Sequence, residues 1–246
     1  LSKALDYAIE RDYLEYNPAK HKLVKKIKLP KTPEIQPYAK DEVNRLIKAV
    51  KGHRYEALLT LGFSTGLREG ELIGLTWDDV DLDEDSLPEV RVRHSLVRYG
   101  TVRDGDVRFE LTDPKTLKST RTVKLNDASI DALRRHRDRP KTASELGDMN
   151  LVFTREDGRP LTYSICRTLL EQLVKVAGVK RQSFKNTRHS YASIALLEGK
   201  SMFQVSRALG HSSYNVTYNT YSHIFEEDAV QMAEAMNNAI PLHPLS

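Results

Sequence analysis

Tyr221 and His211 stand ten residues apart, and their types are the ones that most directly suggest chemistry. A phenol is a poor nucleophile until its proton is removed, and a positioned neighbour usually takes that proton. A histidine can accept or donate a proton near neutral pH. The segment that begins at Leu209 therefore carries a candidate nucleophile and a candidate acid or base. The alternative is that Tyr221 is a half-buried aromatic side chain and that His211 caps a helix.

Two arginines, Arg68 and Arg188, each lie in the first turn of a predicted helix. Helix N-termini bind anions through free backbone N–H groups and the helix dipole, and a guanidinium adds a bidentate clamp for a phosphate. Glu71 follows Arg68 by three residues, so it shares a helix face and can orient a catalytic group. The alternatives are surface ion pairs for the arginines and an ordinary charged pair for Glu71.

The composition is that of an ordinary globular protein with a modest positive charge. The chain has 246 residues, of which 39% are hydrophobic and 29% are charged, and its formal net charge is +4. These values exclude a disordered chain. No apolar run approaches the ~20 residues that a membrane span needs. The single cysteine, Cys166, fits a reducing cytosol, and no Cys/His cluster has zinc-ligand spacing.

The first 35 residues differ from the rest. Residues 1–16 are predicted to be the end of a helix whose apolar face has little to pack on. Residues 18–36 are predicted to be a linker, and we place a domain boundary in this linker. The chain begins at Leu1 without an initiator methionine, and we expect a piece of a longer protein. Six lysines fall in this region: Lys20, Lys22, Lys25, Lys26, Lys28 and Lys31. They predict an arm that follows a phosphate backbone, with a solvated linker as the alternative.

Residues 36–246 are predicted to be mainly α-helical with a small antiparallel sheet. Apolar residues at helical spacing predict helices at 43–50, 55–62, 127–138, 162–177, 186–197, 202–209 and 229–240, and a further helix that follows the turn at 65–68. Alternating residues predict strands at 88–97, 107–111 and 121–125, with a short extended piece at 151–153. A lysine-rich turn at 112–120 joins the last two strands, and 78–85 is predicted to be an acidic loop.

Four motifs occur in a fixed order along this domain: Thr65-Gly66-Leu67-Arg68-Glu69-Gly70-Glu71-Leu72, Thr187-Arg188-His189-Ser190-Tyr191-Ala192-Ser193, Leu209-Gly210-His211-Ser212, and Tyr221. Together they resemble the signature boxes of the tyrosine recombinases, also called phage integrases, over residues 36–246. One box alone is weak evidence, but four in order, with a lysine turn between the first two, are specific. Residues 1–30 resemble the last helix and linker of the family's core-binding domain.

The resemblance implies a role for each of these residues. Tyr221 would attack a DNA phosphodiester and form a 3′-phosphotyrosyl bond, releasing a 5′-hydroxyl. Arg68 and Arg188 would hold the non-bridging oxygens of the phosphate as charge builds up in the transition state. His211 would assist as a proton acceptor or hydrogen-bond donor. Lys115 matches the family lysine that protonates the leaving 5′-oxygen.

The same resemblance implies partners and surroundings. Lys118 is the second candidate for the general acid, and it also belongs to the set of predicted DNA-binding lysines. Arginines and a lysine supply the positive charge that metals supply in nucleases, so no metal or other cofactor is expected. The expected partners are double-stranded DNA, other protomers in a tetramer on that DNA, and accessory DNA-bending proteins, but no membrane. We expect the protein in the bacterial cytoplasm or nucleoid.

One position departs from the family pattern. Lys185 stands three residues before Arg188, where the family usually has a histidine. A lysine can still donate a hydrogen bond to a phosphate, but it can hardly act as a base at neutral pH unless it is strongly desolvated. His189 is the alternative imidazole, although the family pattern makes it a packing residue. A type IB topoisomerase resembles the lysine arrangement and is one rival; a non-catalytic DNA-binding regulator of the same fold is the other.

Overall fold

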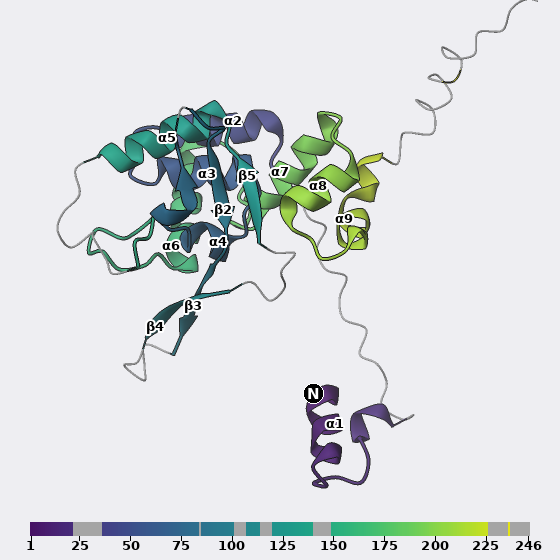
Figure 1. The fold of residues 1–246 in the computed structure, drawn as a ribbon. Coiled ribbons are helices and arrows are strands. Elements are labelled where there is room, and N and C mark those ends of the chain that lie inside the picture. The colour runs from purple at the N-terminus through teal and green to yellow at the C-terminus, as the bar shows by residue number, and fades with distance from the viewer. Residues whose placement is uncertain are drawn as a thin grey trace, which may run out of the picture. The chain divides into compact units, whose positions relative to one another are not determined.

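The computed structural model of the chain describes residues 1–21, 36–83, 85–100, 107–113, 120–139, 149–225 and 236 (Figure 1). The chain divides into two compact units, Leu1–Glu34 and Ile35–Ser246. In the described part, no helix is both long enough and apolar enough to cross a membrane.

The first unit contains helix α1 (Ser2–Glu10) and the short 3₁₀-helix η1 (Pro18–Lys20). The helix predicted over residues 1–16 is therefore too long. The chain leaves α1 through Asp12, which adopts a left-handed φ of 57°, and returns so that the Asn17 side chain donates a 2.7 Å hydrogen bond to Asp6. Lys20 pairs with the same Asp6 at 2.8 Å, and the other five lysines of the predicted arm lie outside the described residues.

Helices are the main elements of the described part of the second unit. They are α2 (Lys40–Val50), α3 (Glu56–Thr65), α4 (Glu69–Ile73), α5 (Asp127–Asp138), α6 (Tyr163–Ala177), α7 (Asn186–Leu197), α8 (Met202–Leu209) and α9 (Tyr214–Tyr221), with 3₁₀-helices η2 (Trp77–Asp79) and η6 (Ser222–Phe225). The helices predicted from apolar spacing, and the one predicted after the turn at 65–68, thus correspond to α2 to α8. The predicted helix at 229–240 lies outside the described residues apart from Met236.

Helix α9 is an element that the sequence pattern did not reveal. Its residues are mostly polar and aromatic, so no continuous apolar stripe marks it. Two of them, Thr217 and Tyr221, are buried, and they are four residues apart on one helix face. The Ser213 hydroxyl caps the helix by accepting a hydrogen bond from the Asn215 backbone N–H.

The strands form two small antiparallel sheets. β1 (Val80–Asp81), β2 (Glu89–Val92) and β5 (Arg121–Lys124) pair in the order β1-β2-β5, and β3 (Ser95–Tyr99) pairs with β4 (Arg108–Thr112) in a hairpin that extends away from the helices (Figure 1). The single strand predicted over 88–97 is wrong, because the structure has two strands there. β2 ends just before Arg93, whose guanidinium pairs with buried Asp79, and β3 begins at Ser95. The predicted acidic loop at 78–85 overlaps η2 and contains β1.

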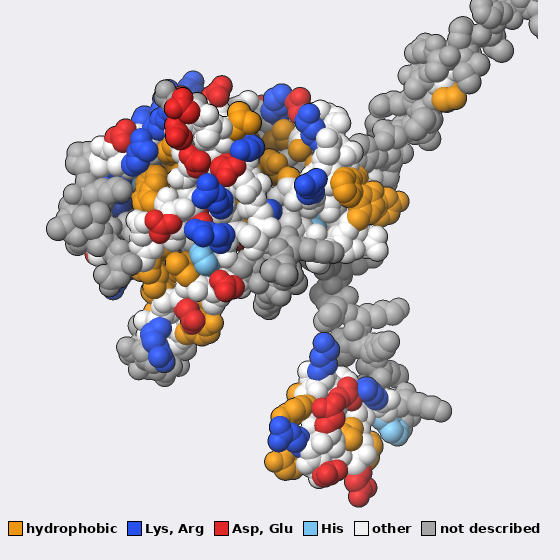
Figure 2. Space-filling model, in the orientation of Figure 1, with side chains coloured by type: hydrophobic (Ala, Val, Ile, Leu, Met, Phe, Trp, Pro, Cys, Tyr) orange, Lys and Arg blue, Asp and Glu red, His pale blue; other side chains and the backbone are white. Residues whose placement is uncertain are grey.

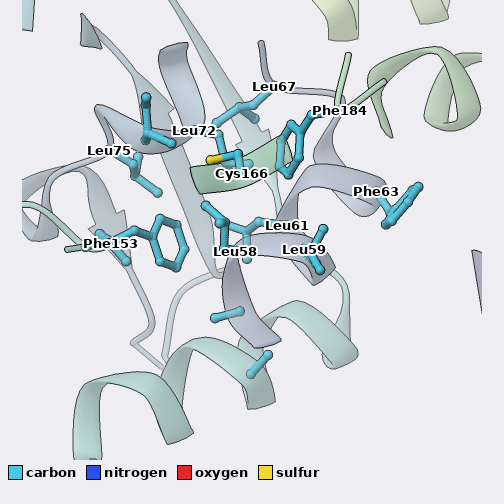
Figure 3. Packing of buried hydrophobic residues seen from close by; sticks show 14 of the residues in the cluster. Leu58, Leu59, Leu61, Phe63, Leu67, Leu72, Leu75, Phe153, Cys166 and Phe184 are labelled. Atoms are coloured by element: carbon cyan, nitrogen blue, oxygen red, sulfur yellow. The ribbon is translucent and has the colours of Figure 1, made fainter. Parts of the chain in front are cut away.

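Two groups of buried apolar residues hold the second unit together. The large core surrounds α3, whose Leu58, Leu59 and Leu61 are fully buried (Figure 3). It also includes Phe153 and Phe184 from distant parts of the chain. The small core consists of Ala192, Leu196, Val205, Leu209 and Tyr221, from α7, α8 and α9. The candidate nucleophile is therefore itself a core residue.

Candidate active site

The junction of α3 and α4 positions Arg68. Helix α3 ends at Gly66, which adopts a left-handed φ of 64°, and a Cβ at this position would lie 2.5 Å from the Tyr191 ring. Only glycine fits that conformation and that gap. Arg68 follows as the N-cap of α4, one residue before the predicted first turn, and its guanidinium donates to Glu71 at 2.7 Å. The side chain of Arg68 is 44% exposed, so it can reach a ligand.

Glu71 joins two arginines. Besides Arg68, it accepts a 2.8 Å hydrogen bond from Arg121, and the Glu71 and Arg121 side chains are both buried. Burial acts to raise the pKa of Glu71, but the contacts with Arg121 and Arg68 outweigh it and hold that pKa at about 2. Glu71 is therefore ionised at neutral pH and fixes both guanidinium groups.

Arg121 is a member of this cluster that the sequence interpretation missed. The sequence pattern places it in a strand but indicates no role for it. One signal was present: Arg121 and Val123 are two residues apart and share a strand face. Val123 is buried, so the arginine points to the interior.

Arg188 lies in α7 and is only 7% exposed. Its two terminal nitrogens each donate a 2.7 Å hydrogen bond, one to the Gly66 carbonyl and the other to the Leu209 carbonyl. Burial, together with the charges of Arg68 and Arg121, lowers the pKa of Arg188 to about 9. The guanidinium is therefore held rigidly between the C-terminal ends of α3 and α8.

The side chains of Arg68, Arg121 and Arg188 all contact the C-terminal end of α8. Its last carbonyls have no partner within the helix, and the helix dipole makes that end attractive to cations. Ala208 accepts from Arg121 at 2.9 Å, Leu209 accepts from Arg188 at 2.7 Å, and Gly210 accepts from Arg68 at 3.4 Å. Three consecutive carbonyls thus place the guanidinium groups side by side.

His211 follows this helix end directly. Its Nδ1 lies 2.7 Å from the Thr217 hydroxyl oxygen in α9. Burial lowers the pKa of His211 to about 4, and the charges of Arg188, Arg68 and Arg121 act in the same direction. The ring is therefore neutral at pH 7 and is oriented by α9.

Tyr221 is the last residue of α9 and is only 2% exposed. Its hydroxyl oxygen lies 2.6 Å from Nδ1 of His189, the residue that the family pattern had made a packing residue. Burial raises the pKa of Tyr221 to about 12 and lowers that of His189 to about 4. The phenol and the imidazole are thus both neutral in the absence of a ligand.

One pocket, of about 440 Å³, brings most of the predicted residues together. Its lining includes Arg68, Lys185, Arg188, His189, His211 and Tyr221. Two other tyrosines of α9, Tyr214 and Tyr218, are alternative candidates for the nucleophile, but they are about half exposed, stack on each other and do not line this pocket. Lys115 and Lys118 lie outside the described residues. The pocket combines fixed cations, neutral imidazoles and a phenol, which is a set suited to an anionic group under nucleophilic attack.

The sequence matches the phage integrase family over residues 38–228. The chain belongs to this family. It is 33% identical to the XerC-like tyrosine recombinase of Caldanaerobacter subterraneus subsp. tengcongensis, over 97% of this chain and 64% of that protein. It is 26% identical to the ICEBs1 integrase of Bacillus subtilis, over 98% of this chain and again 64% of the relative. The chain thus spans slightly less than two thirds of the length of these relatives.

Solved structures confirm the fold class, mainly α with a small antiparallel sheet. The Tn1549 transposon integrase, determined in complex with a circular intermediate DNA, superposes with a TM-score of 0.76 at 22% identity, over 96% of this chain and 76% of that one. XerA recombinase superposes with a TM-score of 0.61 at 20% identity, over 98% of this chain and 74% of that one.

Proposed function

We propose that residues 36–246 are the catalytic domain of a site-specific DNA recombinase that cleaves and rejoins strands through a 3′-phosphotyrosyl intermediate. The observation that carries this proposal is the pocket that Tyr221 shares with Arg68 and Arg188. Membership of the phage integrase family supports it. The two relatives described above are named a tyrosine recombinase and an integrase.

The proposed reaction begins when a DNA phosphate enters the pocket. Arg68 and Arg188 bind its non-bridging oxygens, and Lys185 donates a further hydrogen bond. The Tyr221 oxygen attacks phosphorus as the bond to the 5′-oxygen breaks, and His211 donates a hydrogen bond to the phosphate. Because the guanidinium groups are already held by backbone carbonyls and Glu71, little reorganisation opposes the build-up of charge. We assign protonation of the leaving oxygen to Lys115, with Lys118 as the alternative.

The proposed partners are double-stranded DNA and further copies of the same protein. The complex of the Tn1549 integrase with DNA supports the first. Hydrophobic side chains gather at the α8–α9 end of the second unit, and exposed Phe203, Tyr214 and Tyr218 belong to these helices (Figure 2). Exposed apolar groups of this kind often mark protein contacts, which supports a contact with another copy of the protein, and we propose a tetramer on DNA. We also propose that accessory DNA-bending proteins take part. Residues 1–35 are proposed to be the end of a core-binding domain, with a lysine arm that follows the DNA backbone.

Covalent trapping tests the reaction. We would incubate the protein with a pool of nicked duplexes that carry a randomised region, and separate covalent adducts on denaturing gels. The wild type should form an adduct at Tyr221, located by mass spectrometry, and Tyr221→Phe should form none while still binding DNA. An adduct on Tyr214 or Tyr218 would contradict the assignment of the nucleophile. No adduct at all would favour a non-catalytic regulator.

A type IB topoisomerase is the second candidate, because Lys185 occupies the pocket where the family usually has a histidine. The two functions differ in their need for a defined site. A recombinase should not relax a supercoiled plasmid that lacks the sequence recovered by trapping, whereas a topoisomerase should relax any supercoiled plasmid.

A further inference from the structure

We propose that His189 accepts the hydroxyl proton of Tyr221 during strand cleavage. This inference rests on the proposed function and names a residue for one of its steps. The resemblance to the family had left His189 as a packing residue, with His211 as the imidazole that assists the reaction.

Geometry favours His189 over His211 for this step. Nδ1 of His189 lies 2.6 Å from the Tyr221 oxygen, which is hydrogen-bond distance. Nδ1 of His211 is instead bonded to Thr217, which leaves its Nε2 for the phosphate. Helix α7 carries Arg188 and His189 as neighbours, so the same turn of the helix holds the phosphate clamp and the proton acceptor.

The surroundings of His189 keep its ring neutral before DNA binds. Both side chains are buried, with 8% of His189 and 2% of Tyr221 exposed. Burial lowers the pKa of His189, and the positive charges of Lys185 and Arg188 lower it further. Tyr221 and His211 also lie close to the ring, and both are neutral at pH 7. A neutral imidazole keeps the lone pair that a proton acceptor needs.

A bound phosphate would change this balance. Its negative charge offsets those of Lys185 and Arg188, so the ring becomes more basic when the substrate is in place. Cleavage then forms the bond from the Tyr221 oxygen to phosphorus and breaks the bond from phosphorus to the 5′-oxygen. The phenolic proton moves to Nδ1 of His189, and the leaving oxygen receives its own proton from the proposed lysine acid.

The other ring nitrogen explains why the transfer is reversible. Nε2 of His189 is buried, and none of the described residues is its hydrogen-bond partner. Among the described residues, no carboxylate therefore accepts a hydrogen bond from Nε2 and stabilises an imidazolium, in contrast to a Ser-His-Asp triad. The ring keeps the proton only while the phosphate occupies the pocket. It returns the proton to Tyr221 when the 5′-hydroxyl rejoins the strand.

Two substitutions at this position test the proton transfer with the nicked-duplex pool. His189→Asn keeps a hydrogen-bond acceptor near the position of Nδ1 but cannot take a proton, and it should slow adduct formation by ~10²-fold or more. His189→Ala should be slowed similarly. Added imidazole should partly restore the alanine variant, whereas pyrazole, which has the same shape but is a far weaker base, should not. A wild-type rate in either variant, or equal rescue by both compounds, would overturn the proposal.

A matched control comes from another buried histidine. His136 in α5 is 5% exposed and bonds to the Val152 carbonyl, outside the pocket. His136→Ala should lose stability without imidazole-dependent recovery of adduct formation. If imidazole accelerates the control as much as His189→Ala, the rescue is not specific and the proposal fails.

A measurement that needs no activity tests the contact itself. In the 246-residue chain labelled with ¹⁵N-histidine, Tyr221→Phe should shift the Nδ1 resonance of His189, and an unchanged resonance would contradict the hydrogen bond. The two proposals can fail separately. If the wild type forms no adduct, the proposed function fails and the proton transfer with it; if the wild type forms one and the His189 variants match it, only this inference fails.

Discussion

The large core and the small core contribute different parts of one pocket. The large core surrounds α3 and supports Arg68 at its rim, where the side chain stays partly exposed. The small core has five buried apolar residues among those described, and the nucleophile is one of them. Segments with few buried apolar contacts open at a lower free energy than the rest of a protein. Arg68 is thus anchored to the more stable region and Tyr221 to the less stable one.

Three arginines join these regions at the carbonyls of Ala208, Leu209 and Gly210. This end of α8 leads directly to His211, so the same contacts that link the cores also assemble the pocket. Substitution of a buried arginine of the bridge, Arg121 or Arg188, should therefore affect catalysis and stability together, whereas substitutions in one core should affect that core first.

The largest effect is expected for Arg188→Ala. Loss of a donor to developing charge costs ~10²–10³ in rate, and the two buried carbonyls left without a donor cost roughly 2–6 kcal/mol of unfolding free energy. Single-turnover adduct formation and thermal unfolding measure the two quantities. Arg68→Ala is the control, because its exposed side chain should show the loss of rate with little loss of stability. Equal destabilisation by both variants would argue against the bridge.

Truncation within each core should separate the two regions. Leu58→Ala, in α3, should lower the free energy of global unfolding by about 2–5 kcal/mol. Leu196→Ala, in the small core, should instead speed hydrogen exchange in α8 and α9 and slow adduct formation, while amides of α3 stay protected. Faster exchange in α3 for Leu196→Ala would show that the cores unfold as one.

Acid should weaken the bridge through Glu71. The folded-state pKa of Glu71 is lowered from 4.5 to about 2, so its stabilisation is complete above about pH 4.5 and is lost as the pH falls toward 2. We expect about 2–3 kcal/mol of acid-dependent stability to be absent from Glu71→Gln. Denaturant unfolding at pH 7 and pH 3 checks this, and an identical pH dependence in both proteins would contradict it.

The smallest effect is expected at Glu69, which lines the same pocket and has one buried carboxylate oxygen without a partner among the described residues. Burial raises its pKa from 4.5 to about 7, so stability should fall as the pH rises through this interval. Glu69→Gln should be more stable than the wild type at pH 8 by about 1 kcal/mol, given its partial exposure. At pH 4 the two proteins should unfold alike; a difference that persists there would point to packing instead of charge.

The sequence by itself determined the elements and most of the pocket. Apolar spacing predicted most of the helices from α2 to α8, because they bury apolar residues against a core, and the turn at 65–68 predicted α4. The motif order selected Arg68, Arg188, His211 and Tyr221, which the structure brings into one pocket. Helix α9 was not predicted, because only Thr217 and Tyr221 of its eight residues are buried and they form no apolar stripe in the sequence.

Only the tertiary structure determined which distant residues contact each other. Arg121 lies 50 positions from Glu71 along the chain, and His189 lies 32 positions from Tyr221. Such pairs leave no periodic trace in a sequence, since they arise only when separate helices and strands pack together. The sequence likewise shows that α8 ends at a glycine but not that three arginines meet its carbonyls. Those contacts depend on where α3, α7 and β5 lie around that helix end, and packing of the two cores sets that position.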